Sequence, residues 1–117
     1  MLDVDSGGGA VSGVEDTAKL IRTVNSIKPV TAYCDGTMCS AAYWLASAAG
    51  EVYSGRTAVV GSIGVLMDGF GFTEAMGKLG VERRLLTAGE NKGFLDPFSP
   101  LSEAQREHAK KMLGVIH

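Results

Sequence analysis

The stretch Leu2-Asp3-Val4-Asp5-Ser6-Gly7-Gly8-Gly9 predicts a short apolar strand, Leu2–Val4, that runs directly into a glycine-rich turn. A helix is predicted from about Val14 to Ile27, because its apolar residues recur at helical spacing, and Lys28-Pro29 ends it. The next strand is expected over Val30–Cys34. A strand, a long helix and a second strand in this order predict a right-handed crossover and a mostly parallel sheet covered by helices.

The rest of the chain continues this alternation. The remaining predicted elements are, in chain order, a turn at Asp35–Thr37, a helix of small residues at Ser40–Ala49, a strand at Glu51–Ser54, extended pieces at Ala58–Val60 and Val65–Met67, a helix at Thr73–Leu79 capped by Thr73, a strand at Val81–Leu86, a loop at Thr87–Gly93, and a helix at Ser102–Leu113 capped by Ser102. This order predicts an α/β fold that forms one domain over residues 1–117.

Composition narrows the class of protein. The net charge is −2, which gives no reason to expect nucleic acid or an anionic membrane surface as a partner. Cys34 and Cys39 are too few for a disulfide framework or a zinc site, so we expect small buried thiols, no metal and no cofactor. No stretch is long and apolar enough to predict a membrane span. Both ends of the sequence suggest a piece of a longer protein.

Glycine is the unusual residue, with 16 among 117. The turn Ser6-Gly7-Gly8-Gly9 lies between a predicted strand and a predicted helix, where bare backbone N–H groups can face a ligand. The turn could cradle a phosphate, supply one donor of an oxyanion hole, or be a tight turn only. The chain has neither the G-x-G-x-x-G nor the G-x-x-x-x-G-K-[ST] pattern, which disfavours the phosphate interpretation.

Ser40 stands at the predicted start of the small-residue helix, in Cys39-Ser40-Ala41-Ala42. The first N–H groups of a helix have no intrahelical partner, so a serine there could attack a carbonyl while neighbouring amides hold the oxyanion. The local alternative is that Ser40 only caps the helix.

A serine nucleophile needs a base that takes its proton. The two histidines, His108 and His117, both lie on the last predicted helix, which makes a Ser-His-Asp arrangement difficult to build. A lysine is the other option, because burial lowers the pKa of an amine. Lys92 follows a predicted strand, at the end of a parallel sheet where α/β sites form. The local alternative is that Lys92 is a solvated loop lysine.

Four motifs occur together in a fixed order: Asp5-Ser6-Gly7-Gly8-Gly9, Cys39-Ser40-Ala41-Ala42-Tyr43, Gly61-Ser62-Ile63-Gly64-Val65 and Thr87-Ala88-Gly89-Glu90-Asn91-Lys92. Together they resemble the signal peptide peptidase A and SohB serine peptidases, and Cys39–Ala49 is also similar to the related phage capsid proteases. The resemblance covers nearly the whole chain. It implies a ClpP/crotonase-like fold and a Ser/Lys catalytic dyad.

The resemblance assigns roles to individual residues. Ser40 aligns with the nucleophile, Lys92 with the general base, and Ser62 with a serine that orients that lysine. The oxyanion donors it implies are the amides of Ala41 and of Gly8 or Gly9. An extended substrate would pair with the edge formed by Ile63, Gly64, Val65 and Leu66.

Two departures from the family pattern matter. The usual Ser-Pro-Gly-Gly is Ser6-Gly7-Gly8-Gly9 here, and the lost proline frees a backbone φ angle. The usual Ser-Gly-Gly is Ser40-Ala41-Ala42, which adds Cβ atoms and narrows the site. Neither departure removes a reacting group.

The resemblance implies a serine endopeptidase that cuts extended apolar or small-residue segments, such as cleaved signal peptides. The expected partners are a peptide substrate and further copies of the chain; nucleic acid is not expected. Membrane association would come only from segments outside these residues. By resemblance the protein would be membrane-associated or periplasm-facing, or cytoplasmic if phage-like. The alternatives are a crotonase-like acyl-CoA enzyme and an inactive peptide-binding or assembly subunit.

Overall fold

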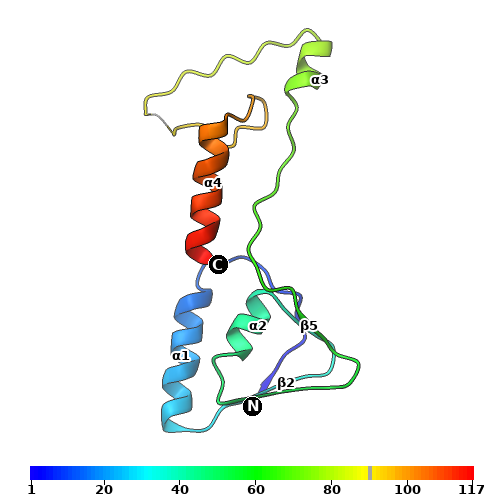
Figure 1. Cartoon of the computed structure of the whole chain (residues 1–117), viewed down its shortest axis with the longest axis vertical. Coiled ribbons are helices and arrows are strands. Elements are labelled where there is room, and N and C mark those ends of the chain that lie inside the picture. Colours follow the sequence, from blue (N-terminus) through cyan, green and yellow to red (C-terminus); the bar gives the residue numbers. More distant parts are fainter. Residues whose placement is uncertain (90) are drawn as a thin grey trace. The chain divides into compact units, whose positions relative to one another are not determined.

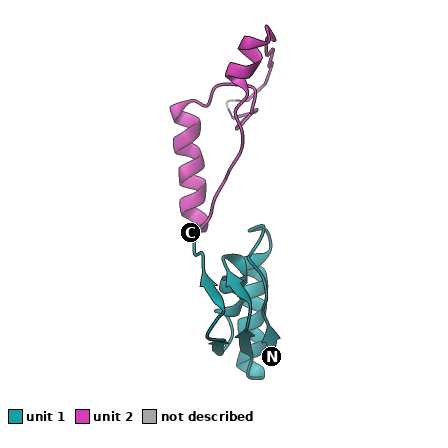
Figure 2. Ribbon diagram, turned by 90° about the vertical axis from the view of Figure 1, so that its right-hand side faces the viewer, with its two compact units in different colours: residues 1–64 teal, residues 65–117 magenta. Residues whose placement is uncertain are grey.

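The computed structural model describes residues 1–89 and 91–117 and divides the chain into two units, residues 1–64 and 65–117 (Figure 2). Glu90, within the predicted loop Thr87–Gly93, lies outside the described residues. The prediction of one domain over residues 1–117 stays a prediction. Among the described residues, no helix has both the length and the apolar character that crossing a bilayer requires.

The first unit contains the predicted crossover. Strands β1 (Leu2–Asp3), β2 (Thr31–Cys34) and β4 (Glu51–Ser54) form a parallel sheet in the order β1-β2-β4. Helix α1 (Val14–Ile27) connects β1 to β2 and has the bounds that its apolar spacing predicts. The α/β class with parallel strands is therefore confirmed.

A second, smaller sheet leads to the candidate serine. Strand β3 (Thr37–Cys39) pairs in parallel with β5 (Val59–Gly61), and Ser6 adds a single parallel bridge to Met38. Helix α2 (Ala41–Ala46) begins directly after Ser40 and packs against α1, beside which it lies in Figure 1.

The core of this unit is made of small side chains. Ala32 and Cys34 from β2, Met38 from β3 and Ala46 from α2 form one buried cluster, in which Met38 is 1% exposed. Alanines on α2 allow the helix backbone to approach the strands closely, as the small-residue pattern predicts. The core thereby fixes the junction between β3 and α2, where Ser40 lies.

The second unit is organised differently. It contains α3 (Thr73–Lys78) and α4 (Glu103–Ile116), and none of its described residues is buried or lies in a strand. Helix α4 begins as predicted, because Ser102 Oγ accepts from the Gln105 amide at 3.2 Å while the Gln105 side chain accepts from the Ser102 amide at 3.0 Å. This reciprocal pair is a capping box.

Several predicted elements need correction. The strand expected at Val81–Leu86 is wrong: its described residues are exposed and pair with no strand, and an apolar pattern alone does not supply a partner. The piece at Val65–Met67 also pairs with no strand among the described residues, and its extended conformation stays a prediction. The N-cap of α3 is Phe72 rather than Thr73.

Two further corrections lie in the first unit. The expected turn at Asp35–Thr37 ends one residue earlier, because Thr37 already pairs with Val59 and begins β3. The helix expected over Ser40–Ala49 is shorter, since α2 ends at Ala46 and the last residues form turns. Local sequence patterns could not predict that β3 begins at Thr37, because its partner β5 is far away in the sequence.

Candidate active site

Ser40 has an uncommon backbone conformation, with φ 54° and ψ −124°. Only a few per cent of residues other than glycine have positive φ, and such strain of about 1–3 kcal/mol gathers at functional sites. Ser40 is the N-cap of α2, but its hydroxyl makes no capping hydrogen bond. Its amide donates to the Gly61 carbonyl at 2.9 Å, so that N–H is not available to a ligand, contrary to the local sequence argument.

The glycine-rich turn lies directly against Ser40. Gly8 has φ +104°, and a Cβ atom built on it would lie 2.7 Å from the Ser40 Cβ and 3.1 Å from the Ala41 nitrogen. No other residue type fits this position, because both the conformation and the space require glycine. The close approach that the glycine pattern predicts is therefore present, between the turn and the start of α2.

The turn is anchored to the strand that ends at Ser40. Asp5 Oδ1 accepts from the Thr37 amide at 2.9 Å. The Ser6 amide donates to the Thr37 carbonyl at 2.7 Å, and the Cys39 amide donates to the Ser6 carbonyl at 3.1 Å. These bonds hold Asp5 and Ser6 in register with β3 up to the residue before Ser40.

The loop Gly61–Gly64 also contacts Ser40, through the Gly61 carbonyl. Gly61, Ser62 and Gly64 have φ values of 137°, 52° and 152°. The hydrogen bond from Ser40 to Gly61 places Ser62 one residue beyond the carbonyl that Ser40 contacts. The structure thus brings together Ser40, Ala41, Gly8 and the start of the Ser62 loop, all in the first unit.

Lys92 belongs to the second unit. It lies in a series of turns over residues 91–95, its amide donates to the Gly89 carbonyl at 3.2 Å, and its side chain is exposed there. The substrate-binding stretch predicted at Ile63–Leu66 crosses the division between the units at Gly64. A contact between Lys92 and Ser40, or between Lys92 and Ser62, stays a prediction.

Comparison with known proteins identifies the family. The model of peptidase family S49 matches residues 22–117. The chain belongs to peptidase family S49. The resemblance to signal peptide peptidase A, SohB and the phage capsid proteases is thereby confirmed, and proteins with the first two names match as well.

Three relatives show how far the similarity extends. The chain is 42% identical over 107 residues to capsid assembly protease C of Escherichia phage lambda, covering 92% of this chain and 24% of that protein. It is 34% identical over 114 residues to a putative protease of Methanocaldococcus jannaschii, covering 97% and 37%. It is 37% identical over 118 residues to a protein named Na⁺/H⁺ antiporter NhaA of Brucella abortus, covering 99% and 16%. The chain thus spans well under half of each relative.

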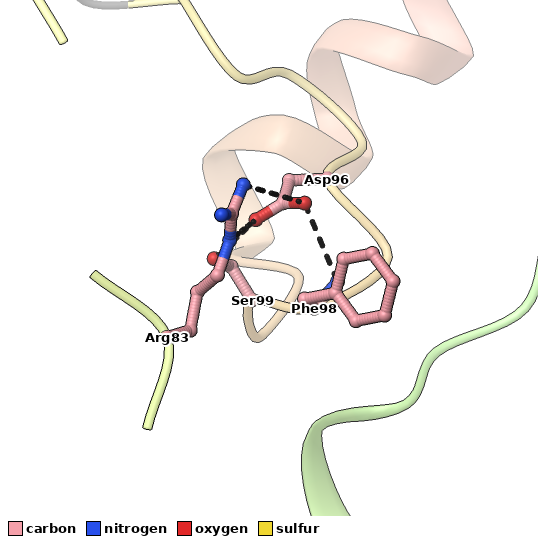
Figure 3. Close-up of polar contacts among 4 residues, drawn as sticks. All are labelled: Arg83, Asp96, Phe98 and Ser99. Carbon is pink, nitrogen blue, oxygen red and sulfur yellow. Dashed lines mark hydrogen bonds and ion pairs between the residues drawn. The ribbon is translucent and has the colours of Figure 1, made fainter. Parts of the chain in front are cut away.

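A polar cluster around Asp96 lies outside the four motifs that carry the family resemblance. Its carboxylate accepts from Ser99 Oγ at 2.6 Å, from Arg83 Nε at 3.2 Å and from the Phe98 amide at 3.4 Å (Figure 3). The Ser99 hydroxyl, aided by the Arg83 guanidinium, lowers the pKa of Asp96 although partial burial opposes this shift. The Asp-Pro-Phe-Ser sequence is a turn signal that could have revealed part of this cluster.

The remaining chemistry-bearing side chains have structural surroundings. Cys34 and Cys39 are buried and unpaired, and Cys39 Sγ donates to the Val59 carbonyl at 3.5 Å. His108 packs edge-on against Phe94, with ring centroids 5.3 Å apart, and His117 is the C-cap of α4. Within residues 1–89 and 91–117, no group of three His, Cys, Asp or Glu side chains gathers as metal ligands.

Proposed function

We propose that this chain carries the catalytic core of a serine endopeptidase in which Ser40 is the nucleophile and Lys92 the general base. The observation that carries the proposal is the conformation of Ser40, held at φ 54° with Gly8 packed against its Cβ atom. A capping serine has no need of this strain, whereas a nucleophile that must project from a sharp strand-to-helix turn does. Membership of family S49 supports the same assignment.

The proposed reaction is acyl transfer through Ser40. Neutral Lys92 takes the proton from Ser40 Oγ as that oxygen bonds to the carbonyl carbon of the scissile peptide. The oxyanion is held by the amide of Ala41 and that of Gly8 or Gly9, each worth about 3 kcal/mol of barrier. The C–N bond then breaks, and protonated Lys92 gives its proton to the leaving amine.

The second half of the reaction restores the enzyme. A water molecule attacks the acyl-Ser40 ester while Lys92 accepts its proton, and the proton returns to Ser40 Oγ as the carboxylic acid leaves. Ser62 donates to or accepts from the Lys92 amine and orients it, which is the role that the family resemblance assigns to it. The left-handed backbone of Gly61 and Ser62 turns that loop away from β5 immediately beside Ser40.

The proposed substrate is an extended peptide with small or apolar residues. Ile63 and Leu66 are exposed, and the backbone around Gly64 and Val65 is unpaired among the described residues, so it can bond an added strand. Ala41 and Ala42 bring Cβ atoms to the start of α2, which favours small residues next to the cut bond. Cleaved signal peptides have this character.

Assembly of several copies is part of the proposal. Lys92 is exposed within its own unit, and a lysine base needs a surface that encloses it. A neighbouring copy, or chain outside these residues, would supply the missing enclosure.

Covalent labelling tests the nucleophile. The full protein is treated with a fluorophosphonate probe, and the modified residue is identified by mass spectrometry in wild type, Ser40→Ala and Lys92→Ala. We expect labelling at Ser40 in wild type, none in Ser40→Ala, and labelling slowed by several orders of magnitude in Lys92→Ala. Ser26→Ala and Lys78→Ala, which change exposed residues of the same types, are the matched controls.

The other outcomes point to the alternatives. Equal labelling of wild type and Ser40→Ala would end the proposal. Acyl-CoA turnover without peptide cleavage would favour a crotonase-like enzyme. Peptide binding without a covalent adduct at any pH would favour an inactive binding or assembly subunit.

A further inference from the structure

Ser6 makes one hydrogen bond that its backbone role does not require. Its amide and carbonyl bond the backbone of Thr37 and Cys39 and fix its place beside β3. Its side-chain oxygen in addition accepts from the Gly8 amide at 3.2 Å. The hydroxyl thus closes a tight turn around Gly7, the residue where the family usually has proline.

This turn sets the position of Gly8, which packs on the nucleophile. The Gly8 site leaves no room for a Cβ atom beside Ser40 and Ala41, so even a small displacement of this loop changes the space at the serine. Gly7 has no Cβ and no neighbour within 4 Å of where one would lie. Its backbone is therefore free to move unless something else restrains the turn.

We propose that Ser6 is a positioning residue of the oxyanion loop and that its hydroxyl restrains the turn around Gly7, where this chain has no proline to fix the backbone. The inference rests on the proposed function. The Gly8 amide is engaged by Ser6 Oγ, whereas the Gly9 amide has no acceptor in residues 1–89 and 91–117. Gly9, together with Ala41, therefore provides the amides that receive the oxyanion, and Ser6 holds them in register.

Two features of the turn make the idea testable by substitution. Ser6 is exposed and its other bonds are made by main-chain atoms, so Ser6→Ala removes the hydroxyl acceptor without opening a cavity. Gly7 is not among the residues with positive φ, and its amide makes no hydrogen bond within the described chain. A proline at position 7 therefore breaks no hydrogen bond and meets no atom at its Cβ position. Ser6 pairs with Met38 in a parallel bridge, which agrees with the extended backbone that a residue before proline favours.

The test measures the rate of fluorophosphonate labelling at Ser40, together with kcat and KM for a small-residue peptide ester. We expect Ser6→Ala to lower kcat and the labelling rate roughly tenfold, with KM nearly unchanged, because only the oxyanion loop is loosened. Ser6→Thr keeps the acceptor and should retain the rate. Gly7→Pro in the Ser6→Ala background should restore most of the labelling rate and of kcat. The control Ser26→Ala should leave both unchanged.

Exchange of the Gly8 amide provides a readout that does not depend on catalysis. We expect its hydrogen exchange to accelerate in Ser6→Ala and not in Ser6→Thr. Two results would overturn the role of Ser6 while leaving the nucleophile intact. The first is that wild type is labelled and Ser6→Ala is labelled at the same rate. The second is that Ser6→Ala is labelled slowly and the added Gly7→Pro does not restore the labelling rate. Failure of wild type to label at Ser40 would instead remove the proposed function.

Discussion

Each of the two units of the chain is stabilised by a different kind of interaction. In residues 1–64, parallel strands enclose a small core, and glycine lets the backbone of one loop touch the start of a helix. In residues 65–117, no described residue is buried, and turns, a capped helix and the Asp96 cluster provide the order. The unit with the proposed nucleophile is shaped by a buried core and paired strands, whereas the unit with the proposed base is shaped by exposed polar and aromatic contacts without a buried core.

This difference has a consequence for the proposed chemistry. Strain at Ser40 persists only because its surroundings over-determine it, and the first unit supplies such surroundings through Gly8 and Gly61. The second unit places Lys92 in an exposed turn, which sets the local backbone but does not bury the amine. The proposed nucleophile is therefore preorganised within its unit, whereas the proposed base would need a further surface to enclose its amine.

The largest expected effect comes from truncating the core of the first unit. Met38→Ala removes the side chain that is 1% exposed at the centre of the buried cluster and should cost about 2–5 kcal/mol of unfolding free energy. The matched change in the second unit, Met112→Ala, alters a residue that is 41% exposed and should cost less than about 1 kcal/mol. Urea unfolding followed by Trp44 fluorescence and by circular dichroism measures both, and equal losses would contradict the contrast between the units.

The next largest effect concerns the contact at the candidate site. Gly8→Ala forces a Cβ atom against Ser40 at φ +104°, which should cost about 2 kcal/mol of stability and slow labelling of Ser40 at least tenfold. Gly114→Ala, in helix α4 with open space around it, should instead stabilise the chain by about 0.5–1 kcal/mol. We therefore expect the same glycine-to-alanine substitution to lower the unfolding free energy at position 8 and to raise it at position 114. A harmless Gly8→Ala would mean that the close approach does not govern the site.

The parts of the fold that sequence predicts are those whose signals lie within a few residues. The bounds of α1 and β4 and the Ser102 cap follow from local spacing and capping residues. Strand β3 was missed because its partner β5 is about twenty residues away, and the strand at Val81–Leu86 was overpredicted because an apolar pattern does not reveal the absence of a partner.

In the candidate site, too, the sequence predicts the features that depend on local signals and not those that depend on distant residues. Sequence identifies Ser40, Gly8 and Ser62 as residues of interest, but serine at the start of a helix predicts an ordinary cap. The positive φ angle of Ser40 comes with contacts to Gly8 and Gly61, which are more than twenty residues away in either direction. Arg83 and Asp96 are thirteen residues apart, and no local pattern joins them.

A smaller effect is expected from the helix cap in the second unit. Ser102→Ala removes the hydroxyl that accepts from the Gln105 amide, while the Ser102 amide can still donate to the Gln105 side chain, and should cost about 1 kcal/mol of local stability. Hydrogen exchange of the first-turn amides of α4 should accelerate several-fold while that of α2 stays unchanged. Faster exchange in α2 as well would show that the two units unfold as one.

The smallest expected effect is an acid dependence confined to the second unit. The pKa of Asp96 is lowered by the Ser99 hydroxyl and the Arg83 guanidinium, so the folded state holds the ionised carboxylate more firmly than the unfolded state does. The stabilisation is complete above the ordinary aspartate pKa and is lost as the pH falls through the lower folded value. Protection of the Phe98 and Ser99 amides should therefore stay constant from neutral pH down to about pH 4 in wild type and decline below it. Asp96→Asn should remove this decline, because a neutral amide has no proton to gain, and the amides of β2 should show no matching change. A decline that persists in Asp96→Asn would assign the acid sensitivity to another carboxylate and would leave the second unit without the polar anchor that distinguishes it from the first.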